Sequence, residues 1–168
     1  QYSDNALSDA IKNENFDLIK SLLQNKVDLN HPNKNGTLPL IQALKKNNTK
    51  IIKILLEHKA NPNARCKKDN SIAYYALENH CPDEVIHLLL DYGLNPNTPV
   101  EDEFNFFHFI IMNKNMDLIK LCIEKGATMD SDTFLATIAL KNTRAIELFL
   151  EHGASVNTFG AHGTPLIC

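Results

Sequence analysis

The segment "LLEHKANPN" at residues 55–63 decides the fold, because similar segments recur as "LLDYGLNPN" at residues 89–97 and "FLEHGASVN" at residues 149–157. Five copies of its final position are found, at Asn30, Asn63, Asn97, Asp130 and Asn157. The successive spacings are 33, 34, 33 and 27 residues. A period near 33 residues is typical of a solenoid built from one small supersecondary unit.

Each repeat contains two short helical patterns. In the second repeat these are "PLIQALKKN" and "TKIIKILLEHK". The second pattern places apolar residues at i, i+1, i+4 and i+5, as in Leu18, Ile19, Leu22 and Leu23, Ile51, Ile52, Leu55 and Leu56, and Val85, Ile86, Leu89 and Leu90. Helices shorter than about 12–15 residues are marginal alone. We therefore expect neighbouring pairs to stack and bury these faces.

These residues resemble the ankyrin-repeat pattern, G-x-T-P-L-H-x-A followed by L-L-x-x-G-A-x-x-N. The first half appears as "GTLPLIQA", "NSIAYYA", "NFFHFI" and "GTPLI". The resemblance implies one all-α ankyrin-repeat solenoid of stacked helix-turn-helix units with short β-hairpin fingers. The predicted repeats cover about 2–32, 33–65, 66–99, 100–130 and 131–157, with a partial sixth at 158–168. We expect the chain to be a fragment of a longer protein.

The family's glycine after the second helix is missing from two copies. Gly93, Gly126 and Gly153 occupy this left-handed position, whereas Lys26 and Lys59 replace it. A side chain there costs about 1 kcal/mol. Two interpretations stay open: the lysines adopt the strained conformation, or the helix ends slightly differently.

The family's Thr-x-x-His pair, which caps the first helix, survives in one repeat as Asn105 and His108. Asparagine is as good an N-cap as threonine. We therefore interpret His108 as a structural residue, and we expect Tyr74 to substitute for it in the third repeat. The fifth repeat lacks about six residues, so we expect it to have lost its finger between Asp130 and Thr133.

The composition of the chain is that of an ordinary soluble protein, with 43% hydrophobic residues, 22% charged residues and a net charge of −3. This balance favours neither nucleic acid nor an anionic membrane as a partner. No apolar run approaches the about 18 residues that a membrane span needs. The four cysteines show no ligand spacing and are typical of reduced thiols, so we expect a cytoplasmic location. Abundant lysine, asparagine and isoleucine suggest an intracellular bacterium or a virus, which would place the protein in the host cytosol.

The sequence contains no recognisable catalytic motif, phosphate-binding loop or EF-hand. The seven histidines fall at repeat-equivalent positions rather than in clusters. We therefore predict no enzyme activity, no catalytic residues, no metal site and no cofactor.

The resemblance implies that the chain binds another protein through its fingers and through the inner face of its first helices. The candidate partner-binding residues match the variable positions of the family. They are Lys34, Asn35, Lys45, Lys46, Arg65, Lys67, Lys68, Glu101, Asp102, Phe104 and Met112.

Two neighbouring fingers carry opposite charge, since "ARCKKDN" at residues 64–70 is basic and "VEDEFN" at residues 100–105 is acidic. They either attract each other or present a split-charge face to a partner.

The aromatic residue of the second of these fingers, Phe104, is either an exposed interface anchor or packs back on Phe106 or Phe107. Tyr74, Tyr75, Phe109 and Met112 continue an apolar trend along the inner face.

The leading functional hypothesis is a protein–protein interaction module, such as the adaptor part of a larger protein. One alternative is a targeting domain of an enzyme whose catalytic part lies outside this chain. Another is a substrate of asparagine hydroxylation, at hairpin residues such as Asn63, Asn97 and Asn157. The sequence identifies neither the partner nor the oligomeric state.

Overall fold

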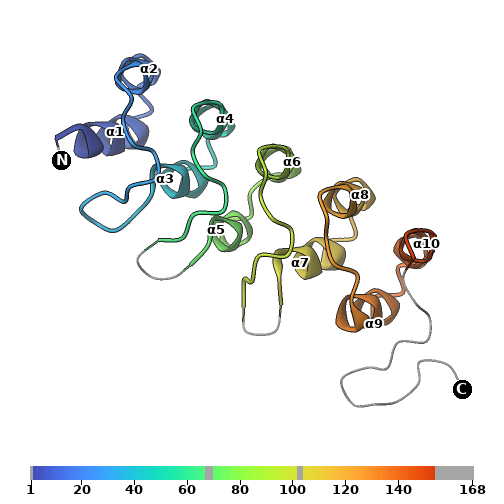
Figure 1. The fold of residues 1–168 in the computed structure, drawn as a ribbon. Coiled ribbons are helices and arrows are strands. Elements are labelled where there is room, and N and C mark those ends of the chain that lie inside the picture. The colour runs from blue at the N-terminus through green and yellow to red at the C-terminus, as the bar shows by residue number, and fades with distance from the viewer. Residues whose placement is uncertain (1, 67–69, 102–103, 154–168) are drawn as a thin grey trace, which may run out of the picture. The chain divides into compact units, whose positions relative to one another are not determined.

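The computed structural model describes residues 2–66, 70–101 and 104–153, with side chains for all of these except residues 2–4 and 131–132. They contain ten helices, which follow one another in pairs (Figure 1). The chain divides into two compact parts, an N-terminal body (Gln1–Leu94) and a C-terminal body (Asn95–Cys168). The predicted partial sixth repeat at 158–168 lies outside the described residues.

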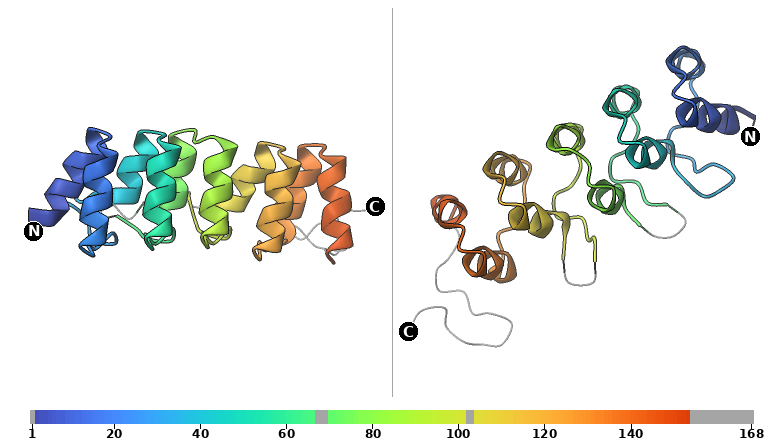
Figure 2. Two further views of the ribbon diagram at one scale, coloured as in Figure 1. Left: turned by 90° about the horizontal axis from the view of Figure 1, so that it is seen from above. Right: turned by 180° about the vertical axis from the view of Figure 1, so that it is seen from behind.

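Three helix pairs make up the N-terminal body. They are α1 (Tyr2–Lys12) with α2 (Phe16–Gln24), α3 (Pro39–Lys45) with α4 (Thr49–Glu57), and α5 (Ile72–Glu78) with α6 (Asp83–Asp91). The first helices contact one another along one layer, α1 with α3 and α3 with α5, and α4 contacts α6 in the other layer. Figure 2 shows these two layers from above.

Two further pairs make up the C-terminal body. They are α7 (Phe106–Met112) with α8 (Met116–Glu124) and α9 (Ser131–Ala139) with α10 (Thr143–Glu151). Here too α7 contacts α9 and α8 contacts α10. Helix pairs that stack in two layers confirm the predicted all-α solenoid architecture.

Side-chain caps explain where most of the second helices begin. An asparagine oxygen accepts a hydrogen bond from a backbone N–H in the first turn of α2, α4, α8 and α10, which satisfies a donor that the helix itself cannot pair. The caps are Asn15, Asn48, Asn115 and Asn142. Helix α6 differs, because it follows Pro82, which makes no side-chain cap bond.

Most residues of the predicted apolar faces of the second helices are buried, but Leu22 is half-buried and Leu18 is exposed. Ile51, Leu55 and Val85 are 0% exposed. Leu18, which stands at the same repeat position as Ile51, is 41% exposed, so the prediction is wrong for this residue. A helix pair precedes the helix of Ile51, whereas among the described residues none precedes the helix of Leu18.

Lys59 adopts the left-handed backbone conformation that the family reserves for glycine. Its φ is 70°, and that of Lys26 is 55°. The N–H of Lys59 donates to the carbonyl of Leu56 (2.9 Å), and the N–H of Ala60 donates to that of Leu55 (3.0 Å). The same pair of bonds is found at Gly93: its N–H donates to the carbonyl of Leu90 (3.0 Å), and the N–H of Leu94 donates to that of Leu89 (2.8 Å). The first interpretation above is therefore correct: the helix ends in the same way and the lysine carries the strain.

Replacing Lys59 with glycine is expected to raise the free energy of unfolding by about 1 kcal/mol, because glycine adopts a positive φ without the Cβ penalty. Urea denaturation followed by circular dichroism measures this change. Lys53→Gly is the matched control, since Lys53 is also exposed but lies inside α4. Glycine there should lower stability by about 1 kcal/mol. Equal effects at both positions would contradict the assignment of strain to Lys59.

The described residues of two fingers are paired by isolated bridges. The third-repeat finger is closed by an isolated bridge between Arg65 and Ser71, and the fourth by one between Pro99 and Asn105. The fifth repeat has no finger, because residues 127–130 lead directly into α9. This confirms the predicted loss.

Candidate functional site

A groove of about 340 Å³ lies in the N-terminal body between the second-repeat finger and the first helices α3 and α5. We call it the inner groove. It is lined by Lys34, Asn35, Thr37, Lys45, Cys66 and Tyr75, among others. Three of the residues predicted to bind a partner, Lys34, Asn35 and Lys45, therefore share one groove. All three are exposed.

The finger that forms one wall of the inner groove is held by a buried side chain. Asn33 is 8% exposed, and its Oδ1 accepts hydrogen bonds from the backbone N–H groups of Asn35 and Thr37, both at 3.0 Å. Its Nδ2 donates to Oγ of Ser8 on α1 (3.0 Å). Gly36 takes a positive φ of 75°, which allows the tight turn. The backbone that carries Lys34 is therefore fixed before any partner binds.

The opposite wall holds a lysine over an aromatic ring. Nζ of Lys45 lies 4.9 Å from the ring centroid of Tyr75, a cation–π contact. Tyr75 is 7% exposed, and its hydroxyl lies 3.7 Å from Sγ of Cys66. Burial raises the pKa of the Tyr75 phenol, and its contact with the Cys66 thiol raises it further. The phenol therefore stays neutral, and Lys45 is the charged group of this wall.

Sequence reasoning missed Cys66 as a site residue and named Tyr75 only as part of the apolar trend. Both lie in the third repeat, while Lys45 lies in the second. Tyr75 follows Lys45 by 30 residues, whereas the residue one 33-residue period after Lys45 is Glu78. The repeat alignment therefore gave no signal of this contact, which depends on how the helices stack.

The capping role predicted for Tyr74 is wrong. The hydroxyl of Ser71 accepts from the Tyr74 backbone N–H (3.1 Å) and caps α5. The Tyr74 hydroxyl instead donates to Oε1 of Glu78 at 3.1 Å. A phenol is longer than an imidazole, so it reaches one turn further along its own helix rather than back to the cap.

In the C-terminal body, Phe104 remains 38% exposed. Its ring makes edge contacts with His108 (centroids 5.6 Å apart) and with Phe109 (6.2 Å). Of the two alternatives for Phe104, the structure therefore favours the exposed residue over packing on Phe106 or Phe107, which are both 0% exposed. Phe104, Phe109 and the 48% exposed Met112 form what we call the α7 patch.

The remaining predicted residues are distributed around these two sites. Lys46 and Arg65 are exposed in the N-terminal body, and Glu101 is exposed in the C-terminal body. Lys67, Lys68 and Asp102 lie outside the described residues, so the predicted attraction between the two fingers stays untested.

His108 is a structural residue, as predicted. It is 4% exposed and lies in a capping box with Asn105, whose backbone N–H donates to Nδ1 of His108 at 3.3 Å. Nε2 of His108 lies 3.3 Å from Oγ1 of Thr133, which lies 2.6 Å from Oδ1 of Asp130. Because a carboxylate only accepts, Thr133 donates to Asp130 and His108 donates to Thr133.

The asparagines that end the repeated segment join one repeat to the next. Nδ2 of Asn63 donates to the carbonyl of Gly93 (2.7 Å), and Nδ2 of Asn97 donates to that of Gly126 (2.9 Å). Oδ1 of Asn97 also accepts from the N–H of Thr128 (2.8 Å). A hydroxylase that acted on either side chain would have to break these bonds. Asn157 lies outside the described residues.

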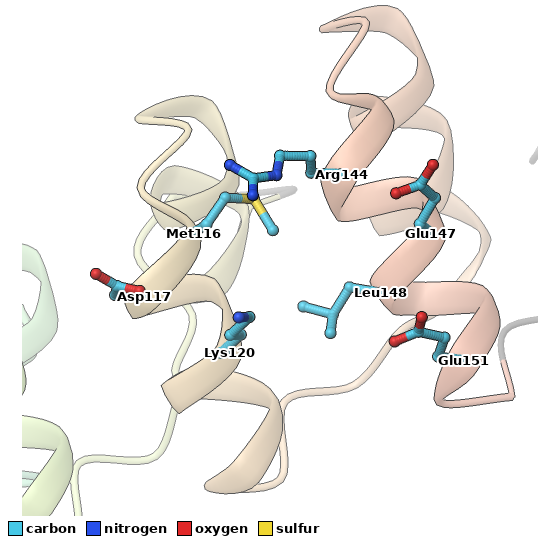
Figure 3. Close-up of a pocket in the computed structure, with 7 residues that line it drawn as sticks. All are labelled: Met116, Asp117, Lys120, Arg144, Glu147, Leu148 and Glu151. Atoms are coloured by element: carbon cyan, nitrogen blue, oxygen red, sulfur yellow. The ribbon is translucent and has the colours of Figure 1, made fainter.

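A second groove, of about 250 Å³, lies between α8 and α10 (Figure 3). Figure 3 shows Arg144 reaching from α10 toward Met116 on α8, with Leu148 directed into the space between the helices. Its rim carries both signs of charge, from Asp117, Lys120, Arg144, Glu147 and Glu151. Such a rim favours neither an acidic nor a basic ligand, and it contains none of the predicted residues.

Within residues 2–66, 70–101 and 104–153, no group of three or more His, Cys, Asp or Glu side chains lies close enough to hold a metal ion. Burial raises the pKa of the Cys81 thiol to about 11 and that of Cys122 to about 12, so both thiols are neutral at pH 7. The thiolate is the nucleophilic form, which makes these two cysteines unreactive. None of the helices in the described part of the chain is long and apolar enough to span a membrane.

Comparisons with known proteins agree with the helix pairs. A family model described as "Ankyrin repeats (3 copies)" matches residues 7–100. Among solved structures, the chain is similar to the ankyrin repeat domain of Bcl-3, described as a unique member of the IkappaB protein family. The TM-score is 0.71 with 21% sequence identity, covering 96% of this chain and 77% of that chain. At this identity the likeness concerns the fold alone. No curated protein matches the sequence.

Proposed function

Because this chain belongs to the ankyrin-repeat family, we propose that it holds a partner protein against its fingers and the inner face of its first helices. Ankyrin repeats are generally protein–protein interaction modules and are typically not catalytic. Which surface of this chain binds, and what it binds, are the parts that belong to the proposal.

The observation that carries the proposal is that Lys34, Asn35 and Lys45 share the inner groove. The three side chains are exposed, and none contributes to the buried core. Exposed positions of this kind usually change stability by less than about 0.5 kcal/mol when substituted. Their gathering in one concave site is therefore better explained by binding than by folding.

The α7 patch supports the same interpretation in the C-terminal body. Phe104 and Met112 expose apolar surface that the core does not use, and half-buried Phe109 lies against Phe104. Aromatic residues and methionine are enriched at protein interfaces. We propose that the partner also contacts the exposed Lys46 and Arg65 of the N-terminal body and the exposed Glu101 of the C-terminal body. Lys67, Lys68 and Asp102 remain candidates from the sequence alone.

The alternative hypothesis, a targeting domain of a larger enzyme, predicts the same binding surfaces. The two hypotheses differ only in whether a catalytic part is attached to this chain. An origin in an intracellular bacterium or a virus, with a host protein as partner, also belongs to the proposal. It rests on residue usage in the sequence.

Site-specific crosslinking tests the proposed surface. A benzophenone amino acid is placed at Asn35 or Met112 on the inner face, and at Lys50 or Lys120 on second helices as matched exposed controls. We expect one and the same protein to be crosslinked in lysate from both inner positions and from neither control, as identified by mass spectrometry. Equal crosslinking from the control positions would show that the binding surface is assigned wrongly.

A further inference from the structure

We propose that the inner groove binds an acidic segment of the partner protein, with glutamate or aspartate carboxylates held by Lys34 and Lys45. This inference rests on the proposed function and specifies the chemistry of the partner at that site. It follows from the charge in the groove, from the way each lysine is held, and from the absence of an internal partner among the described residues.

The charged side chains among the described residues that line the groove are both positive. Lys34 and Lys45 line it, and no carboxylate is found among the described residues of its lining. Neither lysine forms an ion pair in the described part of the chain. Glu78 on α5 accepts a hydrogen bond from the Tyr74 hydroxyl (3.1 Å) and is not among the residues that line the groove. A concave site of one charge concentrates its field and attracts ligands of the opposite charge.

The backbone that carries Lys34 and the ammonium group of Lys45 are both held before binding. The finger that carries Lys34 is held by the buried Asn33 side chain. The ammonium of Lys45 lies over the ring of Tyr75, which is itself buried. An exposed lysine normally loses side-chain freedom when it binds a carboxylate, and holding the group in advance reduces this cost. Tyr75 therefore acts through Lys45 and is a positioning residue.

The test uses the full chain and a fluorescent twelve-residue peptide of alternating glutamate and glycine, compared with the same peptide carrying glutamine instead of glutamate. We expect the glutamate peptide alone to bind, and to shift the NMR amide signals of residues 34–37, 45 and 75. Lys34→Gln and Lys45→Gln should each weaken binding about tenfold, the loss expected for one charge-assisted hydrogen bond. Lys45→Arg should retain binding.

Lys50→Gln and Lys53→Gln are the matched controls, because they remove the same charge from exposed positions on α4. They should change the affinity less than about twofold, since no residue of α4 lines the groove and exposed charges that do not contact a ligand are screened by salt. In a Tyr75→Leu background the loss caused by Lys45→Gln should shrink, whereas in Tyr75→Phe it should persist. This coupling separates positioning of Lys45 from a general effect of Tyr75 on folding.

The inference is overturned if the glutamine peptide binds equally well, if neither peptide binds, or if the α4 controls lose as much affinity as the groove variants. Crosslinking separates this failure from that of the proposed function. A partner that is still captured from Asn35 in the Lys34→Gln, Lys45→Gln double variant would end the acidic-segment inference and leave the proposed function in place. If the chain with its native Lys34 and Lys45 showed neither inner-face crosslinking nor binding of the glutamate peptide, both would end.

Discussion

Replacing Phe107 with alanine is expected to lower the free energy of unfolding by about 3–5 kcal/mol. Phe107 is 0% exposed, and its ring centroid lies 5.9 Å from that of Phe149 on α10. Truncation removes buried apolar surface and leaves a cavity between two helix pairs. The closely packed side chains around the cavity relax only partly, so it stays open. Urea denaturation followed by circular dichroism measures the loss.

Phe104→Ala is the matched control, since it is the same substitution in the same repeat. Phe104 is 38% exposed, so its removal should cost less than about 1 kcal/mol. If the two variants were equally destabilised, Phe104 would be a core residue rather than part of the α7 patch. If Phe107→Ala were harmless, the packing of Phe107 on Phe149 would be wrong.

The second large effect is expected for His108→Ala, which should lower the free energy of unfolding by about 2–4 kcal/mol. The change removes the imidazole that accepts from the Asn105 backbone N–H and donates to Thr133. It leaves the Asn105 N–H without that partner and opens space around the buried Thr133 hydroxyl. A lost partner for a buried polar group costs more than the bond contributes.

His152→Ala is the control for this variant. His152 is exposed, and its Nδ1 lies 2.8 Å from the carbonyl of Leu148 within its own helix end. Its loss should change stability by less than about 0.5 kcal/mol. Thermal unfolding of both variants at one pH distinguishes them, and a His108 variant as stable as the His152 variant would rule out the capping network.

Features that depend on neighbouring residues in the chain were predictable from sequence. The Asn105–His108 cap and the missing fifth finger each follow from a few consecutive residues compared with the other repeats. The same comparison located the unusual position of Lys59 but left its conformation open, and the structure shows it to be left-handed. Repetition makes this comparison reliable, because each copy must satisfy the same local hydrogen bonds.

Predictions failed or stayed open where a side chain could reach several different neighbours. Phe104 contacts His108 and Phe109 rather than the two phenylalanines closest to it in sequence, because those face the core. Tyr74 bonds Glu78 instead of capping its helix. In both cases the contact depends on the direction in which the side chain points. The periodicity of the sequence does not give this direction.

The sequence by itself determined the repeat, its period, the two helices within it and the residues that turn the chain between them. Only the tertiary structure decided that Lys34, Lys45 and Tyr75 meet in the inner groove, because they come from a finger and two helices in different repeats. The physical reason is the stacking itself. Stacking is driven by burial of apolar faces, which the sequence shows, while the polar residues on the exposed side come together only as a consequence of it.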